Sequence, residues 1–204
     1  MNATTKNPVG RPREFDEDKV LAAAIDVFWL QGYDSTSMAD LLAATGLHKG
    51  SLYQAFGDKH TLFIQALQRY VNEFCREMRE AVENADDGLE AVRALLLQSM
   101  EKGCRGEDNN AGCLVINTLV DMGMEDPEVV AVLAQGYARR IALFVQAVTR
   151  AQEEGSLRKD IGPEQMAMMI NIMGMGMIAS LRGPMDLETS AGLIETFLKT
   201  LRTC

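Results

Sequence analysis

The chain has 204 residues, of which 47% are hydrophobic and 24% charged, with 4 cysteines and a formal net charge of −9. This length and composition predict one or two globular domains with an apolar core, and they exclude a chain that is mainly disordered. The sequence has no uncharged apolar run long enough for a membrane span, and its N-terminus lacks the apolar stretch of a secretory signal. We therefore expect a cytoplasmic protein without membrane contact, whose cysteines remain thiols.

The first 13 residues carry a local charge opposite to that of the whole chain. Lys6, Arg11 and Arg13 are positive, and no acidic residue accompanies them. Contacts with phosphate depend on local charge rather than on the total, so this segment is either a basic arm for nucleic acid or a solvated tail.

Helical patterns begin at Asp16. We expect a first helix that Asp16 caps and Gly32 ends. A short second helix begins after Ser37, a capping residue with Asp40 three positions later, and it ends at Gly46. The apolar spacing of the first helix predicts one inward face, formed by Val20, Ala23, Ala24, Val27 and Phe28.

A third short helix is expected close behind the second, within the segment His48–Phe56. Two short helices joined by a turn that contains glycine are a helix-turn-helix candidate. Asp58 then caps a much longer helix, from about Lys59 to Asn84, which links this N-terminal unit to the rest of the chain.

The remaining sequence predicts five more helices and one long polar loop, GCRGEDNNAGC, before the segment CLVINTLVDMG. That segment is expected to be a short, largely buried helix. With about nine helices and no convincing β-hairpin, the fold class is all-α. The five helices are expected at about 89–102, 113–123, 127–154, 163–181 and 187–201.

The sequence offers little chemistry for catalysis. Its two histidines, His48 and His60, lie in or beside the helix-turn-helix segment, so no histidine-based dyad is expected in the C-terminal body. The motifs of serine hydrolases, zinc peptidases and phosphate-binding loops do not occur. We expect no enzyme, no metal and no cofactor. The alternatives are a helical ligand-binding protein without DNA activity and a small thiol enzyme.

The first residues of the third helix suit contact with DNA, because short or hydrogen-bonding side chains allow a helix to enter the major groove. Lys49 can reach phosphate or a guanine edge, Gly50 lets the backbone approach, and Ser51 can contact a base or a phosphate. Tyr53 supplies a phenol for phosphate, and Gln54 an amide able to read adenine. A solvent-exposed segment with an ordinary lysine is the alternative.

The run from Phe15 to Phe63, above all GYDSTSMADLLAATGLHKGSLYQAFGDKHTLF, resembles the DNA-binding domain of TetR/AcrR-family transcriptional regulators. The resemblance implies a homodimeric one-component repressor that binds an inverted-repeat DNA operator and is released by a small-molecule effector. It also implies a basic arm at 1–13, a helix-turn-helix domain at 14–60, and an effector-binding and dimerisation domain at 61–204.

The resemblance assigns roles to single residues. Ser37 and Lys59 would meet phosphate, and Arg11 and Arg13 would enter the minor groove. His48 is either a specificity residue or a packed or solvated histidine. The residues that face DNA from the third helix would be Lys49, Gly50, Ser51, Tyr53 and Gln54.

The segment AGCLVINTLVDMG resembles a subset of the family with a Gly-Cys-Leu motif at the start of the sixth helix, in which some members respond to oxidants or electrophiles. Cys113 occupies the motif position, and Cys104 lies nine residues before it. A helix N-terminus stabilises a thiolate, so modification of Cys113, or a bridge to Cys104, would prevent DNA binding. Alternatively, Cys113 is a small core residue. Cys75 and Cys204 are expected to be structural or incidental.

Six methionines crowd the helix at 163–181. By resemblance, the last two helices form the dimer interface, so we assign these methionines partly to the core and partly to that interface. An effector pocket of unknown ligand would lie among the fourth to eighth helices. The methionines are Met166, Met168, Met169, Met173, Met175 and Met177.

Overall fold

The computed structural model describes residues 15–103, 111–123, 125–183 and 185–203. Within these ranges the chain forms nine helices and no strand, which confirms the all-α prediction. The helices are α1 (Glu17–Gln31), α2 (Met38–Thr45), α3 (Lys49–Phe56), α4 (Lys59–Asn84), α5 (Gly88–Gly103), α6 (Leu114–Met122), α7 (Pro127–Glu153), α8 (Pro163–Ser180) and α9 (Leu187–Leu201).

Local sequence explains where the N-terminal helices begin and end. The Asp16 carboxylate accepts the first free backbone N–H groups of α1. Ser37 and Asp40 form a capping box on α2: the Ser37 hydroxyl accepts the Asp40 N–H at 3.2 Å, and the Asp40 carboxylate accepts the Ser37 N–H at 2.8 Å. Gly46, with a φ of 68°, ends α2 in the left-handed conformation that glycine adopts without strain.

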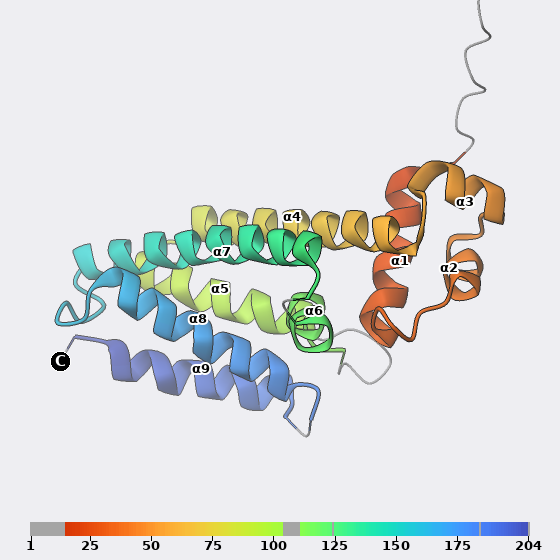
Figure 1. Cartoon of the computed structure of the whole chain (residues 1–204). Coiled ribbons are helices and arrows are strands. Elements are labelled where there is room, and N and C mark those ends of the chain that lie inside the picture. Colours follow the sequence, from red (N-terminus) through yellow and green to blue (C-terminus); the bar gives the residue numbers. More distant parts are fainter. Residues whose placement is uncertain (1–14, 104–110, 124, 184, 204) are drawn as a thin grey trace, which may run out of the picture.

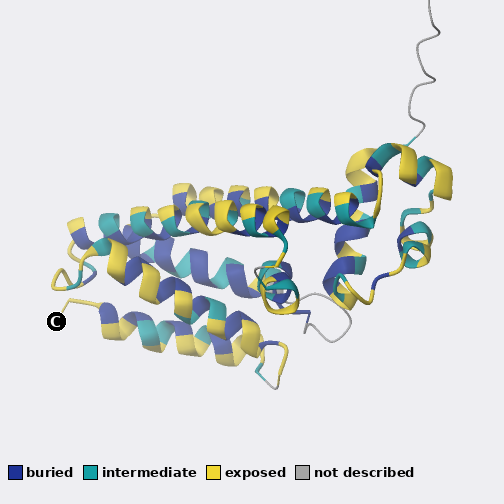
Figure 2. Cartoon of the chain, in the orientation of Figure 1, coloured by how far each residue is buried: buried dark blue, intermediate teal, exposed yellow. Residues whose placement is uncertain are grey.

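The helices separate into two groups along the molecule. Figure 1 shows α1, α2 and α3 at one end, while α5, α7, α8 and α9 lie side by side toward the other. The long α4 begins beside α3 and runs into the second group, where it packs on α5 and α7. The short α6 lies between this bundle and α1. Buried residues line the inner faces of both groups (Figure 2). Because α4 contributes buried residues along its whole length, it connects the apolar cores of the two groups.

Two sequence-based expectations of burial are wrong in part. In α1, Ile25 and Trp29 are buried, whereas Ala23 and Val27 are only half-buried. The inward face therefore lies one residue further along the helix than the pattern indicated, because both α4 and the segment before α6 cover it.

The second correction concerns α6, which is less buried than its apolar sequence suggested. Its buried residues are Leu114, Asn117 and Thr118, while Leu119 is 40% and Val120 75% exposed. Apolar composition alone does not tell which side of a short helix its neighbours cover.

The helix α8 has one buried and one exposed apolar face. Met166 and Met177 are buried, whereas Met168 and Met169 are 46% and 43% exposed, and Ile172 is 61% exposed. Among the described helices, none is long and apolar enough to cross a membrane.

Candidate DNA-binding surface and effector site

The outer face of α3 presents polar side chains above an apolar base. Leu52 and Phe56 are buried and fix α3 on the N-terminal core. The side chains of Lys49 and Gln54 are exposed, and Tyr53 is 41% exposed. This alternation keeps the polar groups available to a partner while the helix is held rigidly from beneath.

The start of α3 is also open. His48 is the N-cap residue, and its exposed side chain makes no capping hydrogen bond. A Cβ atom added at Gly50 would meet no atom within 4 Å, so nothing in the described fold requires glycine there. Ser51 is half-buried. The Lys49 ammonium lies 5.7 Å from the centre of the Tyr53 ring, which brings these two candidate residues together.

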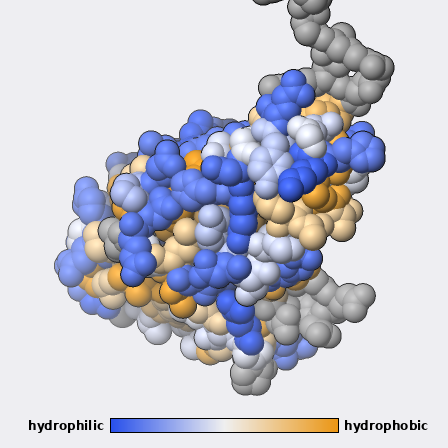
Figure 3. All heavy atoms as spheres, turned by 45° about the vertical axis from the view of Figure 1, so that its right-hand side comes forward, coloured by the Kyte–Doolittle hydropathy of each residue, from blue (hydrophilic) through white to orange (hydrophobic). Residues whose placement is uncertain are grey.

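The other candidates lie beside α3 and are engaged locally. The Ser37 hydroxyl donates to the Asp40 carboxylate at 2.6 Å. The Lys59 ammonium lies 4.4 Å from the centre of the Tyr33 ring and 3.5 Å from the Asp34 carbonyl oxygen. In Figure 3 hydrophilic side chains gather over the upper part of the face shown, next to smaller hydrophobic areas. Arg11, Arg13 and Cys104 lie outside the described residues.

An interaction that the sequence did not reveal ties the start of α4 to the start of α7. His60 Nε2 lies 2.6 Å from the Asp126 carboxylate, and Nδ1 lies 3.5 Å from that of Glu128. Asp126 also accepts the Val129 N–H, and this bond, aided by His60, holds the pKa of the carboxyl below its ordinary value. Although no histidine dyad was expected within the C-terminal body, His60 thus pairs with a carboxylate of that body.

Cys113 is the N-cap residue of α6 and is only 4% exposed. Its sulfur lies 3.7 Å from the Tyr70 hydroxyl on α4, and its side chain lines a small cavity together with Arg140 of α7. The other described cysteine, Cys75, is also buried, and burial raises the pKa of its thiol. Of these two cysteines, Cys113 is the one that lines this cavity.

The segment before Cys113 is bonded directly to α1. The indole N–H of Trp29 donates to the Gly112 carbonyl at 2.8 Å, in a buried position. The Trp29 ring packs edge-on against Tyr70, with 4.9 Å between ring centres. The Asn117 amide of α6 donates to the Ala111 carbonyl at 2.9 Å. The hydrogen bond from Trp29 therefore joins α1 directly to the segment that precedes Cys113 and α6.

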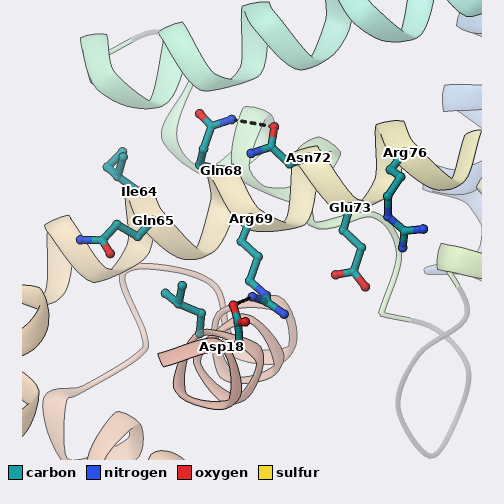
Figure 4. A pocket seen from close by; sticks show the side chains of 9 residues that line it. Asp18, Ile64, Gln65, Gln68, Arg69, Asn72, Glu73 and Arg76 are labelled. Atoms are coloured by element: carbon teal, nitrogen blue, oxygen red, sulfur yellow. Dashed lines mark hydrogen bonds and ion pairs between the residues drawn. The ribbon is translucent and has the colours of Figure 1, made fainter. Parts of the chain in front are cut away.

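A second hollow lies on the surface between α1 and α4 (Figure 4). Arg69 of α4 points toward Asp18 of α1, and the two form an ion pair across it. Gln68 donates to Asn72 at 3.2 Å along the same helix. This groove is open and mostly lined by long polar side chains, so it joins the two helix groups without enclosing a ligand.

Sequence reasoning missed Trp29, His60, Asp126 and Arg140. The first three meet partners far along the chain, which no local pattern indicates. Arg140 had a usable signal, because it falls at helical spacing with the apolar positions of α7 and is buried with them.

The chain matches two family models. Residues 20–66 match the bacterial regulatory proteins of the tetR family, and residues 88–197 match the tetracyclin repressor-like C-terminal domain. The transcriptional repressor ComR of Escherichia coli is 28% identical over 194 residues, which cover 95% of this chain and 92% of ComR.

Solved structures agree with these matches. A cysteine variant of the TetR family regulator CifR, complexed with 26-base-pair operator DNA, is 31% identical, with a TM-score of 0.76 over 94% of this chain and 100% of that chain. The reduced form of NemR from E. coli shares the fold at 18% identity, with a TM-score of 0.80 over 91% of this chain and 96% of NemR. The relatives are DNA-binding regulators rather than enzymes. Two family matches in tandem, and a structural relative aligned over nearly the whole chain, show that this chain belongs to the TetR family of transcriptional regulators.

Proposed function

We propose that this regulator is a homodimeric repressor that binds an inverted-repeat operator and is released when a small molecule binds to the C-terminal bundle. In this proposal, residues 1–13 are a basic arm, 14–60 the DNA-binding domain, and 61–204 the effector-binding and dimerisation domain. The observation that carries it is the exposed polar face of α3, held from beneath by Leu52 and Phe56.

On this face, Lys49 and Tyr53 contact phosphate or base edges, and Gln54 reads a base. Gly50 allows the backbone of α3 to approach the groove, and the open space around it is consistent with that role. Lys59, whose ammonium rests on the Tyr33 ring, meets phosphate at the start of α4. Ser37 and Ser51 add phosphate contacts, His48 adds specificity, and Arg11 and Arg13 enter the minor groove.

The dimer forms through α8 and α9. This dimer is supported by an exposed apolar face that would lie in water if the protein were a monomer. The most exposed residue of this face is Ile172, which is 61% exposed. In a two-fold dimer the two α3 helices must lie about 34–36 Å apart, or a multiple of that, to enter successive major grooves. The residues of the apolar face are Met168, Met169, Ile172, Leu187 and Leu193.

Release follows from a change in the spacing of the two α3 helices. The hydrogen bond from Trp29 to Gly112 and the pair of His60 with Asp126 support this proposal, because both tie the N-terminal helices to the bundle. A nearly complete switch requires about 5.5 kcal/mol of difference between the effector's affinities for the two states.

An alternative trigger is oxidation or electrophile modification of Cys113. The position of this thiol favours the alternative. Cys113 lines a cavity and directly follows Gly112, whose carbonyl accepts the hydrogen bond from Trp29 of α1. A bridge to Cys104 is the second form of this alternative.

The deciding experiment selects fragments of genomic DNA with the reduced, full-length protein and then measures the affinity for the best fragment by fluorescence anisotropy at several salt concentrations. We expect an inverted repeat and a steep salt dependence. Lys49→Ala should lower the salt slope by about one, and Gly50→Ala should weaken DNA binding without loss of stability. The control is Gln135→Ala, an exposed helical position on α7. No enrichment at low salt would favour the ligand-binding alternative.

The thiol trigger has its own test. Cys113→Ser should bind the operator with nearly wild-type affinity and no longer respond to diamide, whereas the control Cys75→Ser should respond like the wild type. Unchanged release of Cys113→Ser by diamide would contradict a role for this thiol.

A further inference from the structure

A buried cation without an ion-pair partner among the described residues lies in the C-terminal bundle. Arg140 of α7 is 8% exposed, and its Nε and Nη2 atoms have no hydrogen-bond partner among the residues that the structure describes. Its guanidinium instead lies near the rings of Phe74 and Phe144, with centres 5.8 and 5.6 Å away. Burial lowers the pKa of Arg140, because desolvation disfavours the charged form.

Such an arrangement calls for a counter-ion. A buried charge is normally paired, and a buried donor without an acceptor is costly. Arginine stays protonated in proteins, and its planar group presents parallel N–H donors that match the two oxygens of a carboxylate. The surrounding aromatic rings replace neither the charge nor the hydrogen bonds that water would supply.

The same guanidinium borders the cavity that Cys113 lines. The cavity has a volume of about 40 Å³, and its other walls are mainly apolar, with Val71, Val115, Ile116 and Met175 among them. Since one water molecule needs about 10–15 Å³ on this measure, the space suits a group of a few heavy atoms. Apolar walls with one convergent charge are typical of sites for small organic ligands.

Helix α8 adds free space beside the guanidinium and a second buried polar atom without a hydrogen-bond partner among the described residues. A Cβ atom at Gly174 would lie 3.7 Å from Arg140 Nη2 and 2.9 Å from a methyl group of Leu96, so glycine leaves room beside the guanidinium. One helical turn away, Asn171 is fully buried, and its side-chain oxygen has no hydrogen-bond partner in the described chain. Its amide donates to the sulfur of Met175, a wall residue, at 3.6 Å.

We propose that this cavity binds a small organic monocarboxylate, with the carboxylate on Arg140 and a short aliphatic tail against Val71, Ile116 and Met175. One guanidinium balances one negative charge, and no second cation lines the cavity within the described residues, so a phosphate dianion fits it less well. The inference names the effector class of the proposed function and depends on that function only for its consequence at the operator.

The test measures binding without DNA. The full-length protein is titrated calorimetrically with sodium salts of acetate, butyrate and hexanoate at constant sodium concentration, and with butyramide as the neutral match of butyrate. We expect at least one acid to bind, and butyrate to bind roughly tenfold to hundredfold more tightly than butyramide. The absence of binding by all three acids, or equal binding of butyrate and butyramide, would overturn the proposal.

Two variants locate the site. Arg140→Met keeps an unbranched apolar side chain without the charged group, and replacing a buried charge by an apolar group commonly preserves folding. It should lose acid binding, while Arg139→Met, whose half-buried guanidinium bonds to Asn72 at 2.7 Å, should keep it. Ile116→Phe fills the cavity and leaves Arg140 in place, so it should also abolish binding. Acid binding that persists in folded Arg140→Met or Ile116→Phe would refute the site.

The operator assay separates this inference from the function on which it rests. A protein that binds the acid but no DNA would retain the site and contradict the repressor. A protein that binds its operator but no acid would retain the repressor and contradict the site.

Discussion

Trp29→Phe removes the hydrogen bond that joins α1 to the segment before Cys113. The indole N–H of Trp29 donates to the Gly112 carbonyl at 2.8 Å, and the side chain is 3% exposed. Phenylalanine has no donor but keeps much of the edge-on contact with Tyr70. The substitution therefore isolates the contribution of the donor and leaves most of the packing.

The expected loss of stability follows from two contributions. A buried carbonyl left without its donor costs about 1–3 kcal/mol. The space left by the smaller ring adds about 1 kcal/mol, because the bundle and α1 cannot fully close around it. We therefore expect the free energy of unfolding to fall by about 2–4 kcal/mol.

The functional consequence has an upper bound. The largest effect that an effector can transmit through this hydrogen bond is the difference between the bond's free energies in the DNA-binding and released states. Each 1.4 kcal/mol of that difference corresponds to about a tenfold change in operator affinity. In Trp29→Phe, the factor by which an effector lowers operator affinity should therefore shrink by at most about tenfold for each 1.4 kcal/mol that the bond contributes, while the effector still binds in its cavity.

Urea unfolding followed by circular dichroism measures the first quantity, and operator anisotropy with and without effector measures the second. Thr203→Val is the matched control, since its hydroxyl donates to the Gly155 carbonyl at 2.9 Å at an exposed position. It should change the stability by no more than about 0.5 kcal/mol. A loss below about 0.5 kcal/mol in Trp29→Phe would refute the reasoning on the buried carbonyl, and an unchanged effector response would refute the role in release.

Two further predictions concern stability. Gly88→Ala places a Cβ atom 2.1 Å from the Ala151 backbone nitrogen, so α5 and α7 must separate. Urea unfolding should then show that the free energy of unfolding falls by at least about 3 kcal/mol. An unfolding midpoint equal to that of the wild type would show that this close approach is absent. Backbone N–H groups hold the pKa values of three N-cap aspartates below 3.8, so their stabilisation is complete above that pH and is lost as pH falls through the lower folded values. Replacing all three by asparagine should flatten the dependence of stability on pH between about 5 and 2, and an unchanged dependence would contradict the assignment to Asp58, Asp126 and Asp186.

Sequence patterns predicted the helix boundaries well where the determining contacts are local. The Ser37 cap with Asp40 occurs as expected, and α7 and α9 begin at the predicted positions 127 and 187, because each helix start depends on residues within four positions. The same local logic predicted that α4 would run from Lys59 to Asn84.

The contacts that connect the two helix groups had no such local signal. Trp29 and Gly112 are 83 residues apart, and His60 and Asp126 are 66 apart, so their pairing depends on how the helices pack. The neighbouring Arg139 and Arg140 show the same limit on a smaller scale. Arg139 bonds to Asn72 near the surface, whereas Arg140 is buried. Which of the two neighbours is buried depends on how α7 is rotated about its axis within the bundle.

The position of Trp29 gives the protein an optical property. It is the single tryptophan of the chain, and it lies at the junction between the N-terminal helices and the segment that carries Cys113. Ultraviolet emission excited in the indole therefore comes from this junction alone. Separation of α1 from Gly112 would bring water to the ring and shift its emission to longer wavelengths, so the unlabelled protein can report the speed of its own rearrangement in a stopped-flow experiment.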